Sequence, residues 1–297
     1  MTGTSPGQIT GNIQAINTLG LGGLEVVKLI KSGVYDLGFG SYSYIASGDA
    51  VFEGIDLALT PANATETRRM VEAYEPVMRE AFARIHAIHL LASYPFPAQS
   101  IGCRDAFSSI DDLRGRKIRV FSTTLGDMAE GLGAVPVSMP FPDVAPALQR
   151  GVIDCAVSGA LSMYVAQWTD VVKYIYQVPA SGGIAFLAIG ANKWNSLTPE
   201  TRGFLSEQAA AFSTRAWDAL DASNEQGLAC LTGQGAACTY GKPASVTLVE
   251  TTPADDARRR ALLEDVVLKK YAARCGAACT TQWNATIGAA LSLTAAE

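Results

Sequence analysis

One order of apolar and polar residues occurs twice along the chain, in Glu25–Asp36 and in Asp143–Asp154. Each copy predicts a short amphipathic helix, a glycine past its end and an apolar strand. A Gly/Ser turn is expected after each strand, at Gly38–Ser41 and at Ser158–Gly159. One interpretation is an ordinary helix–strand junction. The other is two α/β lobes of like construction, whose strand ends face each other across a cleft that holds a small molecule.

Strand and helix patterns alternate through the middle of the chain, which predicts a parallel sheet with helices on its faces. The predicted strands are Gln8–Ile16, Ile101–Arg104, Lys117–Phe121, Val135–Met139, Val152–Val157 and Ile184–Ile189. The predicted helices are Thr65–His89, Leu125–Leu132 and Pro142–Gln149. Prolines interrupt the pattern at Tyr94–Pro97, and glycines at Ser181–Gly183, which predicts two hinge crossovers between lobes.

A longer helix is predicted from Thr198, which serves as N-cap before a proline, as far as Gly227. At 1.5 Å a residue such a helix is about 40 Å long, enough to span both lobes as a spine. The tail predicts a cysteine loop, a strand near Val246–Val249, a helix over Pro253–Ala273 and a last helix from Thr281.

Composition excludes several classes of protein. The chain has 297 residues, 48% of them hydrophobic and 17% charged, which predicts a globular protein with a sizeable core. Its net charge of −5 and the lack of a basic run argue against a nucleic-acid partner. The sequence shows neither an apolar run long enough to span a bilayer nor an export signal at its start.

Six cysteines indicate an oxidising compartment. Cys230 with Cys238 and Cys275 with Cys279 are predicted to pair locally, because each pair is close in sequence and set in Gly/Ala-rich chain. A zinc site and free buried thiols remain alternatives for these four residues. Cys103 and Cys155 lie on predicted strands and form a possible third pair, which the sequence does not decide.

Residues for catalysis are hard to find. The two histidines, His86 and His89, are predicted near a helix end, where an ordinary structural pair is the better interpretation than a metal site. The glycines of Leu19–Gly23 resemble a nucleotide loop only loosely, and no nucleophile has a histidine nearby. Arg119 stands out, because an arginine between apolar residues on a predicted strand needs an anion or carbonyl groups as partners. A partner aspartate within the protein is the alternative.

Several motifs resemble those of the solute-binding subunits of tripartite ATP-independent periplasmic (TRAP) transporters. They are Gly33–Asp36, Asp112–Val120, Leu132–Pro140, Ala147–Asp154, Trp168–Tyr174 and Trp194–Glu200. The resemblance implies two α/β lobes, a hinge, a long spanning helix and capture of an organic acid for a membrane permease. It places the carboxylate-clamping arginine of the family at Arg119.

Three departures from the family pattern bear on the ligand. The chain starts roughly 30–40 residues later than the resemblance implies, so the first strand and helix of lobe I are expected to be missing. Ser158 stands where many relatives have a ligand-contacting asparagine, and Gln99 where many have a second arginine. Aromatic residues near strand ends and hinges are expected to wall the pocket, or else to lie in the core: Tyr42, Tyr44, Tyr94, Phe121 and Trp168.

The sequence therefore predicts an α/β, two-lobed periplasmic-binding-protein fold that is class II-like. Residues 1–98 with 182–198 form lobe I, 99–181 lobe II, 199–227 the spanning helix, and 228–297 a C-terminal segment packed on the lobes. The expected function is capture of a small carboxylate in the periplasm by a monomer, without cofactor, metal or catalysis. An enzyme on the same scaffold and a carboxylate-sensing ectodomain are the alternatives.

Overall fold

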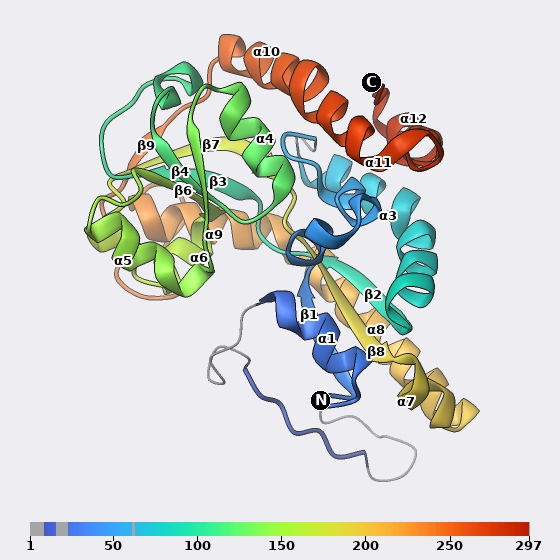
Figure 1. Ribbon diagram of the computed structural model, residues 1–297. Helices are drawn as coiled ribbons and strands as arrows, with labels where there is room; N and C mark the ends of the chain where they lie inside the picture. Colours follow the sequence, from blue (N-terminus) through green and yellow to red (C-terminus); the bar gives the residue numbers. More distant parts are fainter. Residues whose placement is uncertain (1–8, 16–22, 61–62, 297) are drawn as a thin grey trace.

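The computed structural model describes residues 9–15, 23–60 and 63–296, which contain two β-sheets with helices around them (Figure 1). A three-stranded sheet has the strand order β1-β8-β2, and a six-stranded sheet has the order β5-β4-β6-β3-β7-β9. We call the unit around the first sheet lobe I and the unit around the second sheet lobe II.

Lobe I is an antiparallel sheet with β8 at its centre. Its strands and helices are β1 (Leu37–Ser41), β2 (Ile88–Pro95), β8 (Ile184–Gly190), α1 (Val26–Lys31), α2 (Tyr42–Ile45), α3 (Ala64–Ala81) and α7 (Ala191–Ser196). The side chain of Asn63 caps α3 by accepting a hydrogen bond from the backbone of Glu66. A π-helical turn over Phe82–His86 then ends the helix.

Lobe II combines parallel and antiparallel strands. Its elements are β3 (Gln99–Cys103), β4 (Lys117–Val120), β5 (Val135–Ser138), β6 (Cys155–Gly159), β7 (Tyr174–Ser181), β9 (Thr247–Val249), α4 (Thr123–Gly131), α5 (Val144–Gln149) and α6 (Ala160–Val165). Strands β4, β5 and β6 run parallel, but β3 is antiparallel to β6 and β7. The expected all-parallel sheet is therefore wrong, because β3 leaves the hinge region and β7 returns to it.

The two copies of the repeated pattern fold as helix, glycine and strand. The glycines after the helices, Gly33 and Gly151, have φ angles of 74° and 70°, which favour glycine. Both strands begin later than predicted, directly after the aspartates at positions 36 and 154. Gly38–Ser41 therefore lies within β1, and Ser158–Gly159 ends β6, so the expected turns are wrong.

The predicted spine is two helices, α8 (Pro199–Asp218) and α9 (Leu220–Thr232), with Ala219 between them. Helix α8 packs on β2, and α9 packs on α6 (Figure 1). The helix continues beyond its predicted end at Gly227. A Cβ atom there would lie 2.5 Å from the backbone nitrogen of Leu161, so this glycine allows close helix packing and does not stop the helix.

The C-terminal helices form one nearly continuous rod. They are α10 (Pro253–Leu262), a π-helical turn (Leu263–Val267), α11 (Leu268–Trp283), a second π-helical turn (Asn284–Gly288) and α12 (Ala289–Leu291). The expected interruption between Ala273 and Thr281 is present as a kink at Gly276, whose φ of 74° and ψ of 169° depart from helical geometry. The interruption is shorter than predicted, because helical residues continue on both sides of this glycine.

Other predicted elements also need correction. The described residues 9–15 of the predicted strand Gln8–Ile16 contain no strand, and its two ends lie outside the described residues, as do positions 19–22 of the glycine-rich stretch. The helix predicted to reach His89 ends at His86, because Ala87 takes a left-handed conformation with φ 52° and the chain turns into β2. Strand β7 was not predicted at all.

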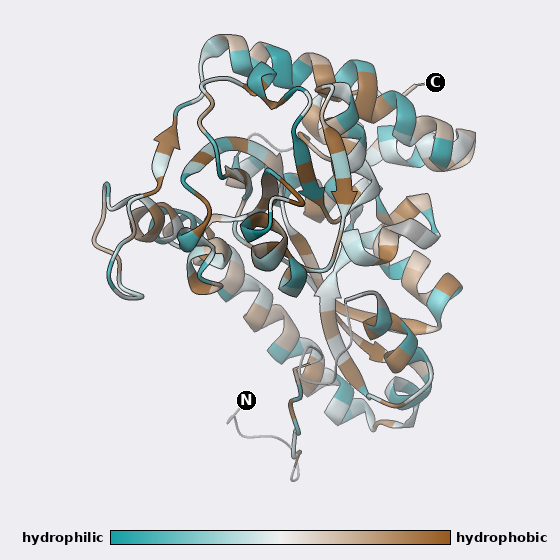
Figure 2. Cartoon of the chain, turned by 60° about the vertical axis from the view of Figure 1, so that its left-hand side comes forward, coloured by the Kyte–Doolittle hydropathy of each residue, from teal (hydrophilic) through white to brown (hydrophobic). Residues whose placement is uncertain are grey.

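The largest buried cluster contains residues of both lobes and of the C-terminal rod, and a second cluster lies beneath the other face of the lobe II sheet. Brown hydrophobic bands lie on the strands and alternate with teal along the helices in Figure 2.

The local disulfides Cys230–Cys238 and Cys275–Cys279 are confirmed. The third pair, Cys103–Cys155, joins directly opposite residues of β3 and β6. Within the described ranges, no helix has the length and apolar character of a membrane span.

Candidate functional site

Arg119 lies near the carboxyl end of β4, between the flanking parallel strands β5 and β6. The residue is only 1% exposed. Among the described residues it is the only lysine or arginine in the buried set. Burying a guanidinium is costly unless hydrogen-bond acceptors replace water around it. The partners of Arg119 therefore decide what this position is for.

Backbone carbonyl groups hold one part of the guanidinium. The Nε atom of Arg119 donates to the oxygen of Met139 at 3.1 Å, and Nη1 donates to the oxygen of Val157 at 2.9 Å. The buried Nη2 atom has no partner in the described part of the chain. A buried donor without an acceptor is rare and costs free energy. The guanidinium is thus fixed in place on one side, and one amino group has no acceptor among the described residues.

Two aromatic side chains lie near the guanidinium of Arg119. The guanidinium carbon of Arg119 lies 4.9 Å from the ring centroid of Phe121, and this ring lies 6.2 Å from that of Tyr44. Phe121 follows β4 in lobe II, whereas Tyr44 belongs to α2 in lobe I. Burial lowers the pKa of Arg119, and the nearby Tyr44 phenol acts in the opposite direction. The site therefore draws on both lobes.

Gln99 and Ser158 lie on neighbouring strands of lobe II. Gln99 is opposite Gly159, and Ser158 directly follows the carbonyl group that binds Arg119. Both residues are buried, at 8% and 4% exposure. The Nε2 atom of Gln99 donates to the oxygen of Pro97 at 2.7 Å, so this side chain also fixes the crossover. Both positions are uncharged.

The other three predicted pocket residues have partners in the interior. Tyr42 packs in lobe I, where its hydroxyl lies 2.8 Å from that of Ser93. The ring of Tyr94 contacts Phe212 of α8, and the ring of Trp168 stacks on Phe141 in lobe II. These contacts are those of core aromatic residues. The structure thus groups Arg119 with Phe121 and Tyr44, and places Tyr42, Tyr94 and Trp168 elsewhere.

Asp56 is a buried charge that the sequence did not single out. Its carboxylate accepts hydrogen bonds from the Ser181 hydroxyl and from the backbone nitrogens of Gly182 and Ile184, at 2.8–3.2 Å. Burial raises the pKa of Asp56, and these hydrogen bonds lower it. Its place in the otherwise apolar stretch from Ile55 to Leu59 was the available signal. Asp56 holds the crossover that leads from lobe II back to lobe I.

The two histidines lie apart from this site. His86 stacks on Phe52, with ring centroids 5.3 Å apart, and His89 stacks on Trp194 at 4.1 Å. No group of three potential metal ligands occurs in the part of the chain that the structure describes.

Comparison with known families identifies the chain. Residues 2–271 match the model of bacterial extracellular solute-binding protein, family 7. The chain belongs to this family. An uncharacterized protein of Salmonella typhimurium is 28% identical over 202 residues, which are 65% of this chain and 61% of that protein. A solute-binding protein of Roseobacter denitrificans is 28% identical over 129 residues, or 43% of this chain and 39% of that protein. The chain thus matches less than two thirds of each relative.

Solved structures show that this family 7 member shares the fold of periplasmic solute receptors. An extracytoplasmic receptor of Bordetella pertussis that binds pyroglutamic acid superposes with a TM-score of 0.83, at 22% identity over 93% of this chain and 87% of that chain. A TRAP periplasmic binding protein of a Sulfitobacter species with bound β-D-galacturonate gives a TM-score of 0.82, at 18% identity over 95% of this chain and 89% of that chain. The two-lobed α/β fold and the likeness to TRAP receptors are therefore confirmed.

Proposed function

We propose that the protein captures a small organic acid between its lobes, with Arg119 as the main anchor for the carboxylate. The observation that carries this proposal is the buried guanidinium, whose Nη2 atom has no partner while carbonyl groups fix the rest. A carboxylate supplies the missing acceptor together with the compensating charge, in a charge-assisted hydrogen bond. Phe121 and Tyr44 then shield this bond from water.

Closure of the lobes is part of this proposal. Arg119 comes from lobe II and Tyr44 from lobe I, so the full set of contacts exists only when the lobes meet. We assign residues 1–98 and 182–198 to lobe I and 99–181 to lobe II, with the crossovers at 96–98 and 182–183 as hinges. Binding by hinge closure follows, because the ligand stabilises the closed arrangement that it helps to build.

The expected ligand class follows from two neutral residues on the neighbouring strands β3 and β6 of lobe II. Gln99 and Ser158 offer hydrogen bonds but no second positive charge. The receptors of like fold are described with pyroglutamic acid and β-D-galacturonate, each of which carries one carboxyl group. We therefore infer a ligand with one carboxylate and further polar groups. Its capture delivers it to the membrane permease of a TRAP transporter.

A periplasmic location suits the chemistry of the chain. Three disulfides hold all six cysteines, and such bonds persist in oxidising compartments. The family to which the chain belongs is described as extracellular. We propose that the mature protein works as a monomer in the periplasm, as a receptor without catalytic activity.

A thermal-shift screen of organic acids tests the proposed ligand class. A ligand at 100 times its dissociation constant stabilises a protein by about 2.7 kcal/mol, which is a rise of a few degrees in melting temperature at this size. We expect hits among monocarboxylates. In Arg119→Lys most of this rise should disappear, because lysine keeps the charge but loses the planar fork of donors.

Arg150→Lys is the matched control, because Arg150 is an exposed arginine of lobe II that also donates to a backbone carbonyl. It should keep the full ligand-induced shift. A carboxylate whose shift survives Arg119→Lys unchanged would place the binding site elsewhere and overturn the proposal.

A further inference from the structure

The C-terminal rod connects the lobes a further time, beside the hinge strands and the spine. On lobe II its first part packs against α4, where Leu262 and Val266 contact Gly131, and Asp255 accepts a hydrogen bond from the backbone of Ile110. On lobe I its last part packs against α3. There the Nε1 atom of Trp283 donates to the oxygen of Gly54 at 2.9 Å. Figure 1 shows the rod, in red, running across both lobes.

Arg274 lies in the middle of this rod and binds a carboxylate of each lobe. Its Nε and Nη2 atoms contact both carboxylate oxygens of Glu53 in lobe I, at 2.7–3.1 Å. The same Nη2 atom lies 2.7 Å from Oδ2 of Asp127, which belongs to α4 of lobe II. Among the ion pairs of the described residues, no other cation pairs with carboxylates of both lobes.

The two carboxylates are well shielded from water. The side chains of Glu53 and Asp127 are 4% and 8% exposed, and that of Arg274 is 30% exposed. Lys270 gives Asp127 a second partner at 3.4 Å, whereas Arg274 is the only ion-pair partner of Glu53 in the described part of the chain. Moving the lobes apart takes Arg274 away from one of the two carboxylates. That carboxylate then needs water in place of a charge-assisted bond.

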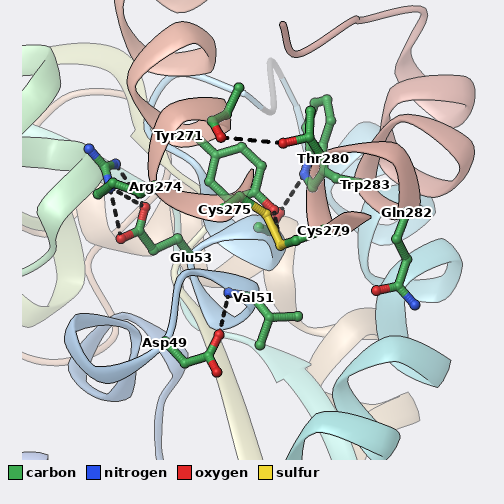
Figure 3. Close-up of a disulfide and its surroundings, with 12 residues drawn as sticks. Asp49, Val51, Glu53, Tyr271, Arg274, Cys275, Cys279, Thr280, Gln282 and Trp283 are labelled. Carbon is green, nitrogen blue, oxygen red and sulfur yellow. Dashed lines mark hydrogen bonds and ion pairs between the residues drawn. A yellow bond between two sulfur atoms is a disulfide. The ribbon is translucent and has the colours of Figure 1, made fainter. Parts of the chain in front are cut away.

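Two features of the neighbouring backbone, a kink and a disulfide, restrict the position of Arg274. Gly276, two residues later, breaks the helical conformation between the part of the rod on lobe II and the part on lobe I. The disulfide Cys275–Cys279 spans this break, directly beside Arg274 (Figure 3). Figure 3 also shows Arg274 reaching towards Glu53 from the same turn of the rod as Tyr271. The disulfide thus limits how far this break lets the arginine move.

We propose that Arg274 is a positioning residue for ligand capture, a latch that holds Glu53 of lobe I and Asp127 of lobe II together when the lobes are closed over Arg119. The role of this latch in ligand capture rests on the proposed function. A closed state that is more populated before binding raises the apparent affinity, and a closed state that opens more slowly retains the ligand for longer. The latch therefore governs release of the carboxylate without touching it.

Arg274→Gln tests the latch, with Arg258→Gln as its matched control. Arg258 lies on the same rod and pairs with Asp111, a carboxylate of lobe II, so its loss leaves the connection between lobes intact. Hydrogen exchange of the ligand-free proteins reports closure at two interlobe contacts: the backbone of Ala58, which donates to Thr124, and α2 with Tyr44. We expect faster exchange at both contacts in Arg274→Gln and wild-type exchange in Arg258→Gln.

Release of the strongest monocarboxylate from the thermal-shift screen gives the second readout. We expect Arg274→Gln to raise its dissociation rate constant about tenfold, while association changes far less, as is usual among variants of one binding site. Exchange and release that match Arg258→Gln in both measurements would overturn the latch. If the screen yields no carboxylate, a difference in exchange between the two variants still supports the latch, and the proposed ligand class alone fails.

A second variant tests the latch even if Arg274→Gln folds poorly. Glu53→Gln removes only the lobe I end of the latch and leaves Arg274 paired with Asp127. We expect it to show the same direction of change at Ala58 and α2. Glu53→Gln with wild-type exchange at these contacts would contradict the proposal, because the lobe I carboxylate would then have no part in closure.

Discussion

Charged and titratable side chains inside this protein are held in different ways. The guanidinium of Arg119 is fixed by carbonyl groups and keeps one amino group unpaired. The carboxylate of Asp56 is fully surrounded by donors. The first set of partners leaves a donor unpaired, and the second satisfies the carboxylate within the protein alone. This contrast is why we propose Arg119 as a binding residue and Asp56 as a structural one.

The histidines give a prediction for the effect of pH on stability. Burial lowers the pKa of both His86 and His89 below the usual 6.5. Between the lowered values and 6.5 the native state binds fewer protons than the unfolded state, so the free energy of unfolding falls as the pH falls through this window. Above 6.5 their full contribution is present. We expect the melting temperature to decrease as the pH is lowered from about 8 to about 5.

The double variant His86→Phe/His89→Phe isolates this effect. Both rings already stack on aromatic partners, so phenylalanine keeps the stacking and removes the titration. Its melting temperature should depend less on pH than that of the wild type between pH 5 and 8. Parallel profiles for the two proteins would show that the histidines do not contribute.

At the scale of elements, the repeated pattern predicted the order of helix, glycine and strand but not where each strand starts. The apolar residues that predict each strand begin at Val34 and Val152, yet these two residues are 65% and 48% exposed. Pairing begins only at Leu37 and Cys155, where the chain meets its partner strand. The local pattern carries no information about that partner. Strand β7 was missed for a related reason, since Pro179 and the polar Gln177 mask a strand that non-local pairing stabilises.

The disulfides contribute unequally to stability. The Cys103–Cys155 bond closes 52 residues of chain, whereas Cys275–Cys279 closes four. On the chain-entropy model the first contributes about 4 kcal/mol and the second about 2 kcal/mol. We expect Cys103→Ala/Cys155→Ala to lose roughly twice as much free energy of unfolding in urea as Cys275→Ala/Cys279→Ala. Equal losses would mean that residual structure in the unfolded chain cancels the difference in loop length.

At the scale of the whole molecule, the sequence indicated two lobes and a spine, but it did not indicate how the lobes are tied together. Asp56, Glu53 and Arg274 act on residues more than 100 positions away. Contacts of this kind have no fixed spacing along the chain, so a single sequence gives no signal that the two residues meet. For the candidate site, Arg119 with its strand was predictable, whereas the choice of Tyr44 and Phe121 among five aromatic residues needed three-dimensional contacts.

The crossover depends on one carboxylate in particular. Asp56→Asn replaces an oxygen that accepts hydrogen bonds by an amino group that cannot, opposite the hydroxyl of Ser181 and the backbone nitrogen of Gly182 or Ile184. We expect a loss of about 1–3 kcal/mol in the free energy of unfolding, because buried donors remain unsatisfied. Urea denaturation measures it. The exposed Asp170→Asn is the control, and a loss no larger than in that control would refute this role of Asp56.

The interleaving of the lobes along the chain dictates an order of assembly. The edge strand β1 and the central strand β8 meet through Ser41 and Ile184, which are 143 residues apart in sequence. During synthesis or export lobe I therefore has no centre until nearly two thirds of the chain has emerged, and closing so long a loop is entropically slow. The β3–β6 pair and its disulfide lie within the intervening segment and need none of lobe I. The strands β3 to β6 around Arg119 are thus available first, the lobe I sheet is completed next by β8, and the edge strand β9 joins lobe II last.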